Sequence, residues 1–399
     1  MPYYIGDVIK ESRRLQARTP EEFAKQGVTV RLNTMVEGIE IDKAQVRLKG
    51  GERVPYDVLV VATGTTATAP DIPGTDLEGV FTLKTLTDGI TIKRYIEENS
   101  CRRGVIVGAG FIAMEMSEAF RLRGMETRVV YRGELPVKKW DQAFSKRVLD
   151  EIQRNEVSFL TGRSPLAIEK SDNGALRLIT NDGDVEGDII ILALGTKPET
   201  ALAHDAGIAL GKSGALQVNF SQRTNMEEVY SVGDCAEVFH RISKHWVNLP
   251  LGDIANRQGR VAGRNIGGYP MIFPGVVGSQ CFKIFNLQVA ATGLDERDAV
   301  RSGYNPESAI IKGSYIARSM SSEAELDLKL IADKSTGRLL GAQAIGAGGA
   351  VDRINTLSAC LWAEMDLDQI GYMDLAYSPP FGGAWDVIQT AAQILKKKL

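Results

Sequence analysis

The sequence predicts an α/β protein, and three observations support this fold class. An apolar strand, a glycine turn, a helix and a second strand follow one another from residue 104 to residue 131. This βαβ order implies a parallel sheet. Residues 28–61 alternate apolar and polar side chains in short bursts, which is typical of a meander of strands. After Pro270, four strands followed by two helices indicate a separate C-terminal α+β unit.

The first elements are expected to be a helix over residues 7–26 and then strands up to residue 61. The helix is interrupted at Arg18–Phe23, where Pro20 and the acidic residues after it favour a new helix start. The strands are expected at the segments VTVRL, VEGIEI, AQVRL and DVLVVA. Glycines and charged turns separate them.

The remaining elements follow from apolar runs and helical periodicity. Helices are expected at residues 143–155, 253–266, 349–363 and 384–397. Strands are expected in the segments SFLTG, LRLIT, DIIILALG and VYSVGD, and at residues 280–285, 309–315, 326–332 and 339–345.

Composition excludes several classes of function. Of the 399 residues, 44% are hydrophobic and 24% are charged, which is the balance of a soluble globular protein. The net charge of -3 provides no basic field for nucleic acid. Apolar runs are strand-length, well below the roughly 20 residues that span a membrane, and the start does not resemble a signal peptide. We expect a cytoplasmic protein that binds neither nucleic acid nor membrane.

The cysteines and histidines do not predict a disulfide or a metal site. The four cysteines have no CxxC spacing, and the three histidines are scattered along the chain. No Cys/His cluster has zinc-finger spacing. We expect four free thiols in a reducing compartment and no bound metal.

The glycine turn after the strand at residue 104 predicts a dinucleotide site. Gly108 permits the tight turn, and Gly110 lets the backbone approach a pyrophosphate. Ala113 stands where the helix packs on the strand. The N-terminus of the following helix offers N–H groups and a positive dipole to the phosphates. The alternative is a glycine-rich turn that serves packing only.

The residues after the second strand predict which nucleotide binds. An NAD site is expected to have an acid there, to accept hydrogen bonds from the ribose. This sequence has Tyr131 and Arg132 instead, and Lys138 and Lys139 follow. A guanidinium suits the 2′-phosphate of NADPH. We therefore expect NADPH rather than NADH, unless Arg132 is an ordinary surface residue.

Four further segments resemble elements of the flavoproteins called pyridine nucleotide–disulfide oxidoreductases. They are Tyr56–Gly64, Ala193–Pro198, Thr224–Asp234 and Leu249–Arg260. Within this family the chain is most similar to the coenzyme A disulfide reductase and NADH oxidase branch. Three segments carry that likeness, namely Pro2–Gly6, Arg18–Phe23 and Asp374–Phe381.

The resemblance implies two Rossmann-like dinucleotide-binding domains and a C-terminal α+β dimerisation domain. The FAD domain would comprise residues 1–97 and 218–268 and be truncated at its N-terminus. The NAD(P) domain would be residues 98–217, and residues 269–399 would form a homodimer interface. The resemblance implies that Asp234 binds the ribityl chain of FAD, and that Phe111 covers the flavin until nicotinamide displaces it. Glu115 would lie near the nicotinamide.

The remaining cofactor-binding residues are carried over from the matching motifs. They are Ala62, Thr63, Gly64, Ile112, Gly195, Gly233, Leu249, Pro250, Leu251 and Ala255. For Phe111 and Glu115 the alternatives are core packing and a helix-surface carboxylate.

Two features of the family fall outside the sequence. The first GxGxxG unit and the redox cysteine precede the Pro-Tyr-Tyr-Ile motif in this branch, whereas Pro2 here follows Met1. We expect either a start further upstream or a chain truncated in nature, with or without bound FAD. Cys235 is expected to be a packing residue. Tyr377 matches one of two tyrosines of the coenzyme A branch, but residues 318–323 lack the other, which weakens the expectation of coenzyme A itself.

The expected function is that of a FAD-dependent oxidoreductase. Hydride would pass from NADPH through flavin to a disulfide, persulfide or similar sulfur acceptor, with Glu115 and Tyr377 as the catalytic candidates in this chain. One alternative is an NAD(P)H oxidase that reduces oxygen. Another is a truncated, catalytically silent module that binds a nucleotide.

Overall fold

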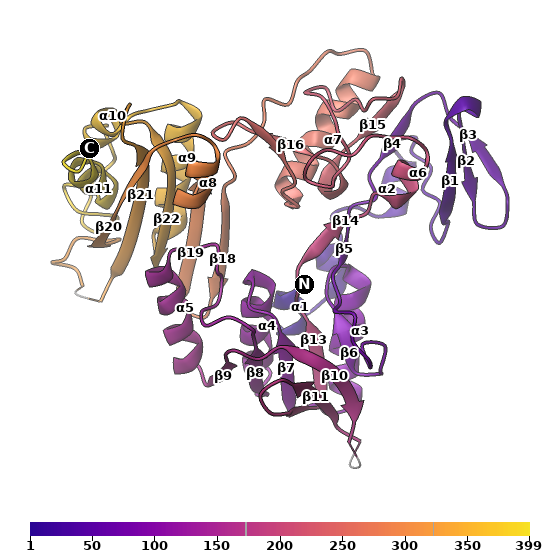
Figure 1. Cartoon of the computed structure of the whole chain (residues 1–399), viewed down its shortest axis with the longest axis horizontal. Helices are drawn as coiled ribbons and strands as arrows, with labels where there is room; N and C mark the ends of the chain where they lie inside the picture. Colours follow the sequence, from indigo (N-terminus) through magenta and orange to yellow (C-terminus); the bar gives the residue numbers. More distant parts are fainter. Residues whose placement is uncertain (172–173, 322) are drawn as a thin grey trace. The chain divides into compact units, whose positions relative to one another are not determined.

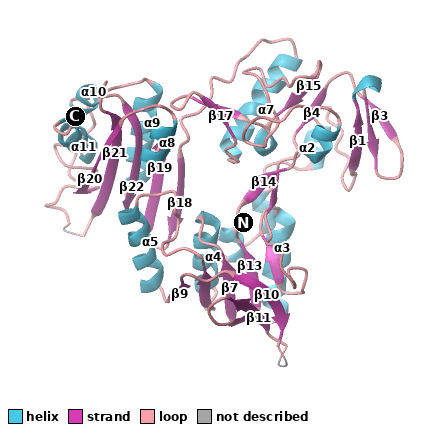
Figure 2. Cartoon of the chain, in the orientation of Figure 1, coloured by secondary structure: helices cyan, strands magenta, loops and turns pink. Residues whose placement is uncertain are grey.

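The computed structural model describes residues 1–171, 174–321 and 323–399 (Figure 1). The chain forms two compact units. The larger unit comprises residues 1–12, 67–195 and 277–399, and the smaller unit comprises residues 13–66 and 196–276. Helices and strands alternate in the first half of the larger unit, as Figure 2 shows. This confirms the expected α/β class.

A five-stranded parallel sheet organises the first part of the larger unit. Its strands run in the order β6-β13-β7-β8-β9, and each adjacent pair is parallel. The expected βαβ unit is present as strand, helix and strand. The bounds are β6 (Val80–Thr82), β7 (Arg103–Val107), β8 (Glu126–Val130), β9 (Val157–Leu160), β13 (Ile189–Leu192), α3 (Leu86–Glu98), α4 (Phe111–Leu122) and α5 (Gln142–Arg154).

Two smaller elements accompany this parallel sheet. Strands β10 (Pro165–Lys170), β11 (Leu176–Thr180) and β12 (Val185–Gly187) form an antiparallel sheet. The short helix α1 (Pro2–Ile5) packs against α3 and α4. A Cβ added to Gly6 would lie 2.9 Å from the Cα atom of Ala119, so the chain passes very close to α4 there.

An antiparallel sheet of the order β18-β19-β22-β21-β20 forms the C-terminal part of the larger unit. Helix α9 packs against β19 and β22, and α11 packs against β20 and β21. Nearly all side chains of β21 and β22, on both faces of the sheet, are buried. The bounds are β18 (Gln280–Ile284), β19 (Leu287–Gly293), β20 (Pro306–Ser314), β21 (Glu325–Asp333), β22 (Leu339–Gly346), α8 (Glu296–Arg301), α9 (Ala350–Trp362), α10 (Leu367–Gly371) and α11 (Val387–Lys396).

One hydrophobic core joins the two parts of the larger unit. Phe120 of α4 and Phe144 of α5 belong to the same buried cluster as Phe282, Ile284 and Val289 of the C-terminal sheet. The parallel sheet and the C-terminal sheet therefore share a core, so a residue of one part can position a residue of the other.

The smaller unit contains short strands and one long helix. Strands β1 (Val36–Glu40), β2 (Gln45–Leu48) and β3 (Arg53–Pro55) form an antiparallel sheet, and β4 (Leu59–Val61) pairs in parallel with β15 (Val229–Ser231). Two further pairs are β5 (Thr65–Ala67) with β14 (Thr196–Pro198), and β16 (Val238–His240) with β17 (His245–Val247). The helices are α2 (Pro20–Ala24), α6 (Ala201–Asp205) and α7 (Gly252–Ile266), with 3-10 turns η1 (Ser12–Leu15), η2 (Ile41–Lys43) and η3 (Gly233–Cys235).

Two expectations near the N-terminus are wrong. Residues 7–17 do not form the expected helix, because Asp7 adopts a left-handed conformation (φ 61°) and only a 3-10 turn follows at Ser12–Leu15. The new helix start expected at Pro20 is confirmed, because Thr19 caps α2 through a capping box with Glu22. The segment VTVRL at residues 28–32 is not a strand. Its alternating side chains are exposed on both faces, so no core selects an extended pairing. Within the described part of the chain, no helix is long and apolar enough to cross a membrane.

Candidate cofactor-binding site

The glycine turn after β7 has two glycines with different physical roles. Gly108 has φ +114°, and a Cβ there would lie 2.3 Å from the carbonyl oxygen of Ala193. Only glycine fits this position, because both the backbone conformation and the close approach exclude a side chain. A Cβ at Gly110 would meet nothing within 4 Å. Gly110 is the N-cap of α4 and makes no side-chain capping bond, so the N-terminus of this helix remains open to a ligand.

A cavity of about 590 Å³ lies at this turn, at the carboxyl ends of β7, β8 and β13. Ligands of open α/β sheets bind at this edge. Six of the residues predicted from the sequence line the cavity, namely Gly108, Gly110, Phe111, Arg132, Lys138 and Gly195. The Phe111 side chain is exposed, unlike an ordinary core phenylalanine.

The cavity is strongly basic. Its described lining includes four cationic side chains, those of Arg132, Lys138, Lys139 and Arg163, and no carboxylate. The backbone N–H of Arg163 donates to the carbonyl oxygen of Tyr131 at 3.1 Å, which joins the segments that follow β8 and β9. Arg163 also pairs with Asp182, outside the lining, at 3.6 Å. The described lining itself contains cations and no carboxylate, which favours an anionic ligand.

Sequence reasoning did not identify three of the lining residues, Arg163, Ser164 and Trp140. Arg163 and Ser164 follow β9, which lies beside β8 in the parallel sheet. A basic residue just after the strand next to β8 is the signal that would have indicated Arg163.

Three predicted residues lie on α4 but outside the cavity lining. Ala113 is fully buried and packs in the core, as expected where helix meets strand. Ile112 is partly buried and packs against the same core. Glu115 is also partly buried, and this burial raises the pKa of its carboxyl above the usual range. The nearby N-terminal ammonium opposes this rise in the pKa, and the carboxylate of Glu118 adds to it.

The predicted flavin residues lie in the smaller unit, at the ends of its parallel strand pair. Ala62, Thr63 and Gly64 follow β4, while Gly233 and Asp234 lie just beyond β15. Both segments therefore begin at the same, C-terminal end of the strand pair. Gly64 (φ +72°) and Gly233 (φ +80°) adopt conformations that favour glycine.

Several contacts fix the segment around Asp234. The backbone N–H of Gly233 donates to the Gln258 side chain at 2.8 Å, and the Asn248 amide donates to the Asp234 carbonyl oxygen at 2.8 Å. The Thr65 hydroxyl donates to the Asp234 carboxylate at 3.4 Å. This carboxylate already accepts from one hydroxyl, so its chemistry fits a ligand that carries several hydroxyl groups.

The start of α7 lies beside this turn. Ala255 lies near Gly233, at 3.6 Å from the position of an added Cβ. Leu249 and Leu251 pack on a small core, whereas Pro250 is exposed. The N-cap of α7 is Leu251, which makes no side-chain capping bond. Like α4, this helix begins with N–H groups that can donate to a phosphate or a ring carbonyl.

Three buried cysteines and Tyr377 differ in their positions relative to the site. Cys235 is fully buried, 3.4 Å from the carbonyl oxygen of Val232, a position that suits packing. Cys101 and Cys360 are buried, and burial raises the pKa of Cys101 to about 11. Tyr377 is exposed between α10 and α11 and lines no part of the cavity. Part of the 318–323 segment, at Ser322, lies outside the described residues.

Comparisons with known proteins identify the family. Residues 6–259 match the family described as pyridine nucleotide-disulphide oxidoreductase, and residues 279–388 match its dimerisation domain. The chain is 36% identical to an NAD(P)H sulfur oxidoreductase (CoA-dependent) from Pyrococcus abyssi, over 98% of this chain and 88% of the relative. It is 30% identical to an NADH oxidase from Methanocaldococcus jannaschii, over 100% of this chain and 90% of the relative.

A solved structure gives the same result. The NAD-dependent persulfide reductase from A. fulgidus superimposes with a TM-score of 0.95 at 32% identity, covering 100% of this chain and 75% of that protein. The chain therefore belongs to the pyridine nucleotide-disulphide oxidoreductase family.

Proposed function

We propose that this protein is a FAD-dependent oxidoreductase that takes electrons from NADPH and passes them to a disulfide, persulfide or related sulfur acceptor. Members of its family are FAD-dependent enzymes that use NAD(P)H. The single observation that carries the choice of NADPH is the cavity beside Gly110, lined by four cations and, among its described residues, no carboxylate.

In this proposal each group of residues has a defined task. The open N-terminus of α4 binds the pyrophosphate, and Arg132 and Arg163 bind the 2′-phosphate. Phe111, whose exposed side chain lines the cavity, is the residue that the nicotinamide would displace. Asp234 accepts hydrogen bonds from the ribityl hydroxyls of FAD, and the start of α7 faces the flavin ring. When bound, the flavin would supply the capacity to accept hydride and release electrons.

The sulfur acceptor is proposed from the relatives. The Pyrococcus abyssi relative and the A. fulgidus protein are named for sulfur and persulfide reduction. Reduction of a sulfur–sulfur bond requires attack by a thiolate. Cys101, Cys235 and Cys360 are buried and do not suit that task. The residues described above therefore serve nucleotide binding and flavin support, and these three cysteines supply no attacking thiolate.

An NAD(P)H oxidase that reduces oxygen is the second candidate function. The observation that favours it is the Methanocaldococcus jannaschii relative, an NADH oxidase whose likeness covers the whole chain. Both candidates need the same nucleotide and flavin sites and differ only in the acceptor.

We also propose a homodimer in a reducing compartment such as the cytoplasm. The match of residues 279–388 to a dimerisation domain supports the dimer. Tyr372, Phe381 and Trp385 of the C-terminal segment expose more than half of their side chains, and exposed aromatic surface of this kind is typical of a protein interface. The four free cysteines agree with a reducing compartment.

Charge reversal at Arg132 tests the nucleotide assignment. Arg132→Glu is expected to raise the NADPH dissociation constant by about tenfold or more, because it removes a charge-assisted hydrogen bond to the 2′-phosphate. The NADH constant should change far less, since NADH lacks that phosphate. Both constants are measured by titration of the purified protein.

Arg102→Glu is the matched control for this experiment. Arg102 is exposed and precedes β7, at the opposite end of the strand from the cavity. The Arg102→Glu substitution should leave the dissociation constants of both NADPH and NADH unchanged. An equal loss of NADPH and NADH affinity in Arg132→Glu would show that Arg132 does not contact the 2′-phosphate.

A further inference from the structure

A basic segment, defined here as residues 132–139, forms one wall of the nucleotide cavity. It connects β8 to α5 and contains Arg132, Lys138 and Lys139, all of which line the cavity. The backbone N–H of Val137 donates to the carbonyl oxygen of Ala109 at 2.8 Å, which attaches the segment to the glycine turn. The position of its C-terminal end depends on how the next two residues, Trp140 and Asp141, are held.

Asp141 is held by two residues of the C-terminal sheet. Its carboxylate lies 2.6 Å from the ammonium of Lys329 on β21, and its backbone N–H donates to the Gln343 side chain on β22 at 2.7 Å. Lys329 and Gln343 are directly opposite in the register of the two strands. The ammonium of Lys329 and the side-chain oxygen of Gln343 therefore lie side by side on the sheet, and both bind Asp141, just beyond the basic segment.

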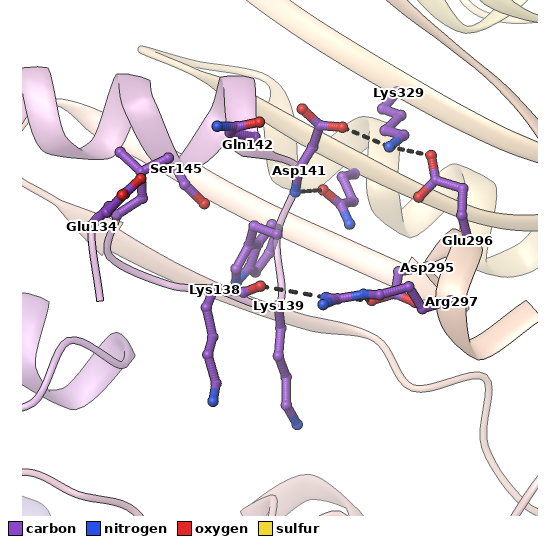
Figure 3. Close-up of a pocket in the computed structure, with 13 residues that line it drawn as sticks. Glu134, Lys138, Lys139, Asp141, Gln142, Ser145, Asp295, Glu296, Arg297 and Lys329 are labelled. Carbon is purple, nitrogen blue, oxygen red and sulfur yellow. Dashed lines mark hydrogen bonds and ion pairs between the residues drawn. The ribbon is translucent and has the colours of Figure 1, made fainter. Parts of the chain in front are cut away.

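Lys329 is a buried cation between two acids. Its side chain is only 5% exposed, and it forms ion pairs with both Asp141 and Glu296 (Figure 3). Burial alone would lower the pKa of Lys329, but its hydrogen bonds to the two carboxylates outweigh this effect and raise the pKa. The ammonium therefore stays charged at neutral pH and keeps the two carboxylates together.

Two more contacts bring C-terminal residues to the same stretch. The Arg297 guanidinium donates to the carbonyl oxygen of Lys138 at 3.4 Å, and the Trp140 ring packs edge-on against Phe282 with centroids 5.8 Å apart. A second hollow of about 530 Å³ lies beside these contacts, and Lys138 and Lys139 line both hollows. In Figure 3 both lysine side chains point away from Lys329, toward open space.

We propose that Lys329 and Gln343 are positioning residues for the nucleotide site, which hold the basic segment so that its cations meet the 2′-phosphate of NADPH. The inference rests on the proposed function and extends it to the C-terminal domain. Without the ammonium, the carboxylates of Asp141 and Glu296 lose the cation that lies between them and repel each other. Asp141 then moves, and the basic segment moves with it, so the preference for NADPH over NADH falls.

Lys329→Met is the principal test, because methionine keeps the apolar length of the side chain and removes its charge. We expect an NADPH dissociation constant about tenfold higher, with NADH affinity changed little, since only NADPH uses the basic segment. Both constants are measured by titration of the full chain with each nucleotide. The melting temperature of each variant is measured in parallel to establish that it folds.

Lys334→Met is the matched control. Lys334 follows β21 and is also ion-paired, with Glu307 at 2.9 Å, but it is more exposed and lines neither hollow. It should leave both dissociation constants unchanged. Gln343→Leu provides a second test should Lys329→Met fail to fold, since it removes only the hydrogen bond to Asp141. The Gln343→Leu substitution should raise the NADPH dissociation constant several-fold.

The outcomes separate this inference from the proposed function. A folded Lys329→Met or Gln343→Leu protein with wild-type affinity for NADPH would overturn the positioning role alone. A wild-type protein that binds neither nucleotide would overturn the proposed function, and this inference with it. Equal losses of NADPH and NADH affinity would reduce Lys329 to a general structural role and also overturn the inference.

Discussion

At the scale of single residues, the nucleotide cavity depends on two glycines that are needed for different reasons. Gly108 is required by the fold, because its backbone conformation is left-handed and an added Cβ would collide with the carbonyl oxygen of Ala193. The fold does not require glycine at position 110, because an added Cβ would meet nothing within 4 Å, so only the proposed ligand would require it. One residue therefore controls stability and the other controls access to the helix N-terminus.

This difference predicts opposite outcomes for two alanine variants. Gly108→Ala is expected to lower the free energy of unfolding by about 2 kcal/mol or more, through backbone strain and the collision. Gly110→Ala should lower it by less than about 1 kcal/mol, yet weaken NADPH binding, because its Cβ occupies the pyrophosphate approach. Chemical denaturation and nucleotide titration measure the two effects. Equal stability of the two variants would contradict this division of roles.

How far the site could be predicted from sequence depends on which residues are local to one another. Gly108, Gly110 and Phe111 belong to one turn, and Arg132 follows the next strand, so a single βαβ pattern predicts that they lie together. Arg163 is about thirty positions further along and reaches the cavity only because β9 pairs with β8. Lys329 is further still, and no local pattern relates it to the basic segment.

At the scale of elements, Asp188 joins two strands of the parallel sheet. It lies at the start of β13, and its carboxylate accepts from the backbone N–H groups of Arg102 and Arg103 at 2.8 Å each. The Arg103 guanidinium donates two more hydrogen bonds to the Asp188 carboxylate, at 2.7 and 3.1 Å. Burial raises the pKa of Asp188, but these hydrogen bonds outweigh it and hold the pKa below its usual range.

The pH dependence of stability can be derived from this lowered pKa. The ionised Asp188 carboxylate stabilises the fold fully above the pKa of an aspartate in the unfolded chain, which is near 4. This stabilisation is lost as the pH falls through the lower pKa that Asp188 has in the folded protein. Asp188→Asn should therefore cost about 2 kcal/mol of unfolding free energy at pH 7 and progressively less below about pH 4. The control Asp184→Asn, at an exposed carboxylate 4.0 Å from Arg177, should cost far less. A cost for Asp188→Asn that is independent of pH would contradict this account.

Elements with a strong periodic pattern were predictable from sequence, and others were not. The strands around the glycine turn and helix α7 lie where expected. Strand β19 was missed, because its residues Ala290, Ala291 and Gly293 give only a weak strand signal. It becomes an interior strand because β18 and β22 pair with it on either side. Helix α3 was also missed, since polar residues interrupt its apolar stripe.

At the scale of the whole molecule, the two compact units contain different parts of the proposed chemistry. The larger unit carries the proposed nucleotide cavity and the C-terminal sheet, whose Lys329 pairs with Asp141 next to the basic segment. The smaller unit carries the segments around Thr63 and Asp234 that suit FAD. The sequence could predict both sets of motifs. It could not predict that α4 and α5 share one hydrophobic core with β18 and β19.

The most direct test of the central claim is an anaerobic spectral titration of the purified protein supplied with FAD. We predict that NADPH bleaches the visible flavin absorbance at a lower concentration than NADH does, and that added polysulfide restores it without oxygen. Recovery with oxygen alone would favour the oxidase. A protein that binds no flavin, or whose flavin spectrum NADPH leaves unchanged, would contradict the assignment.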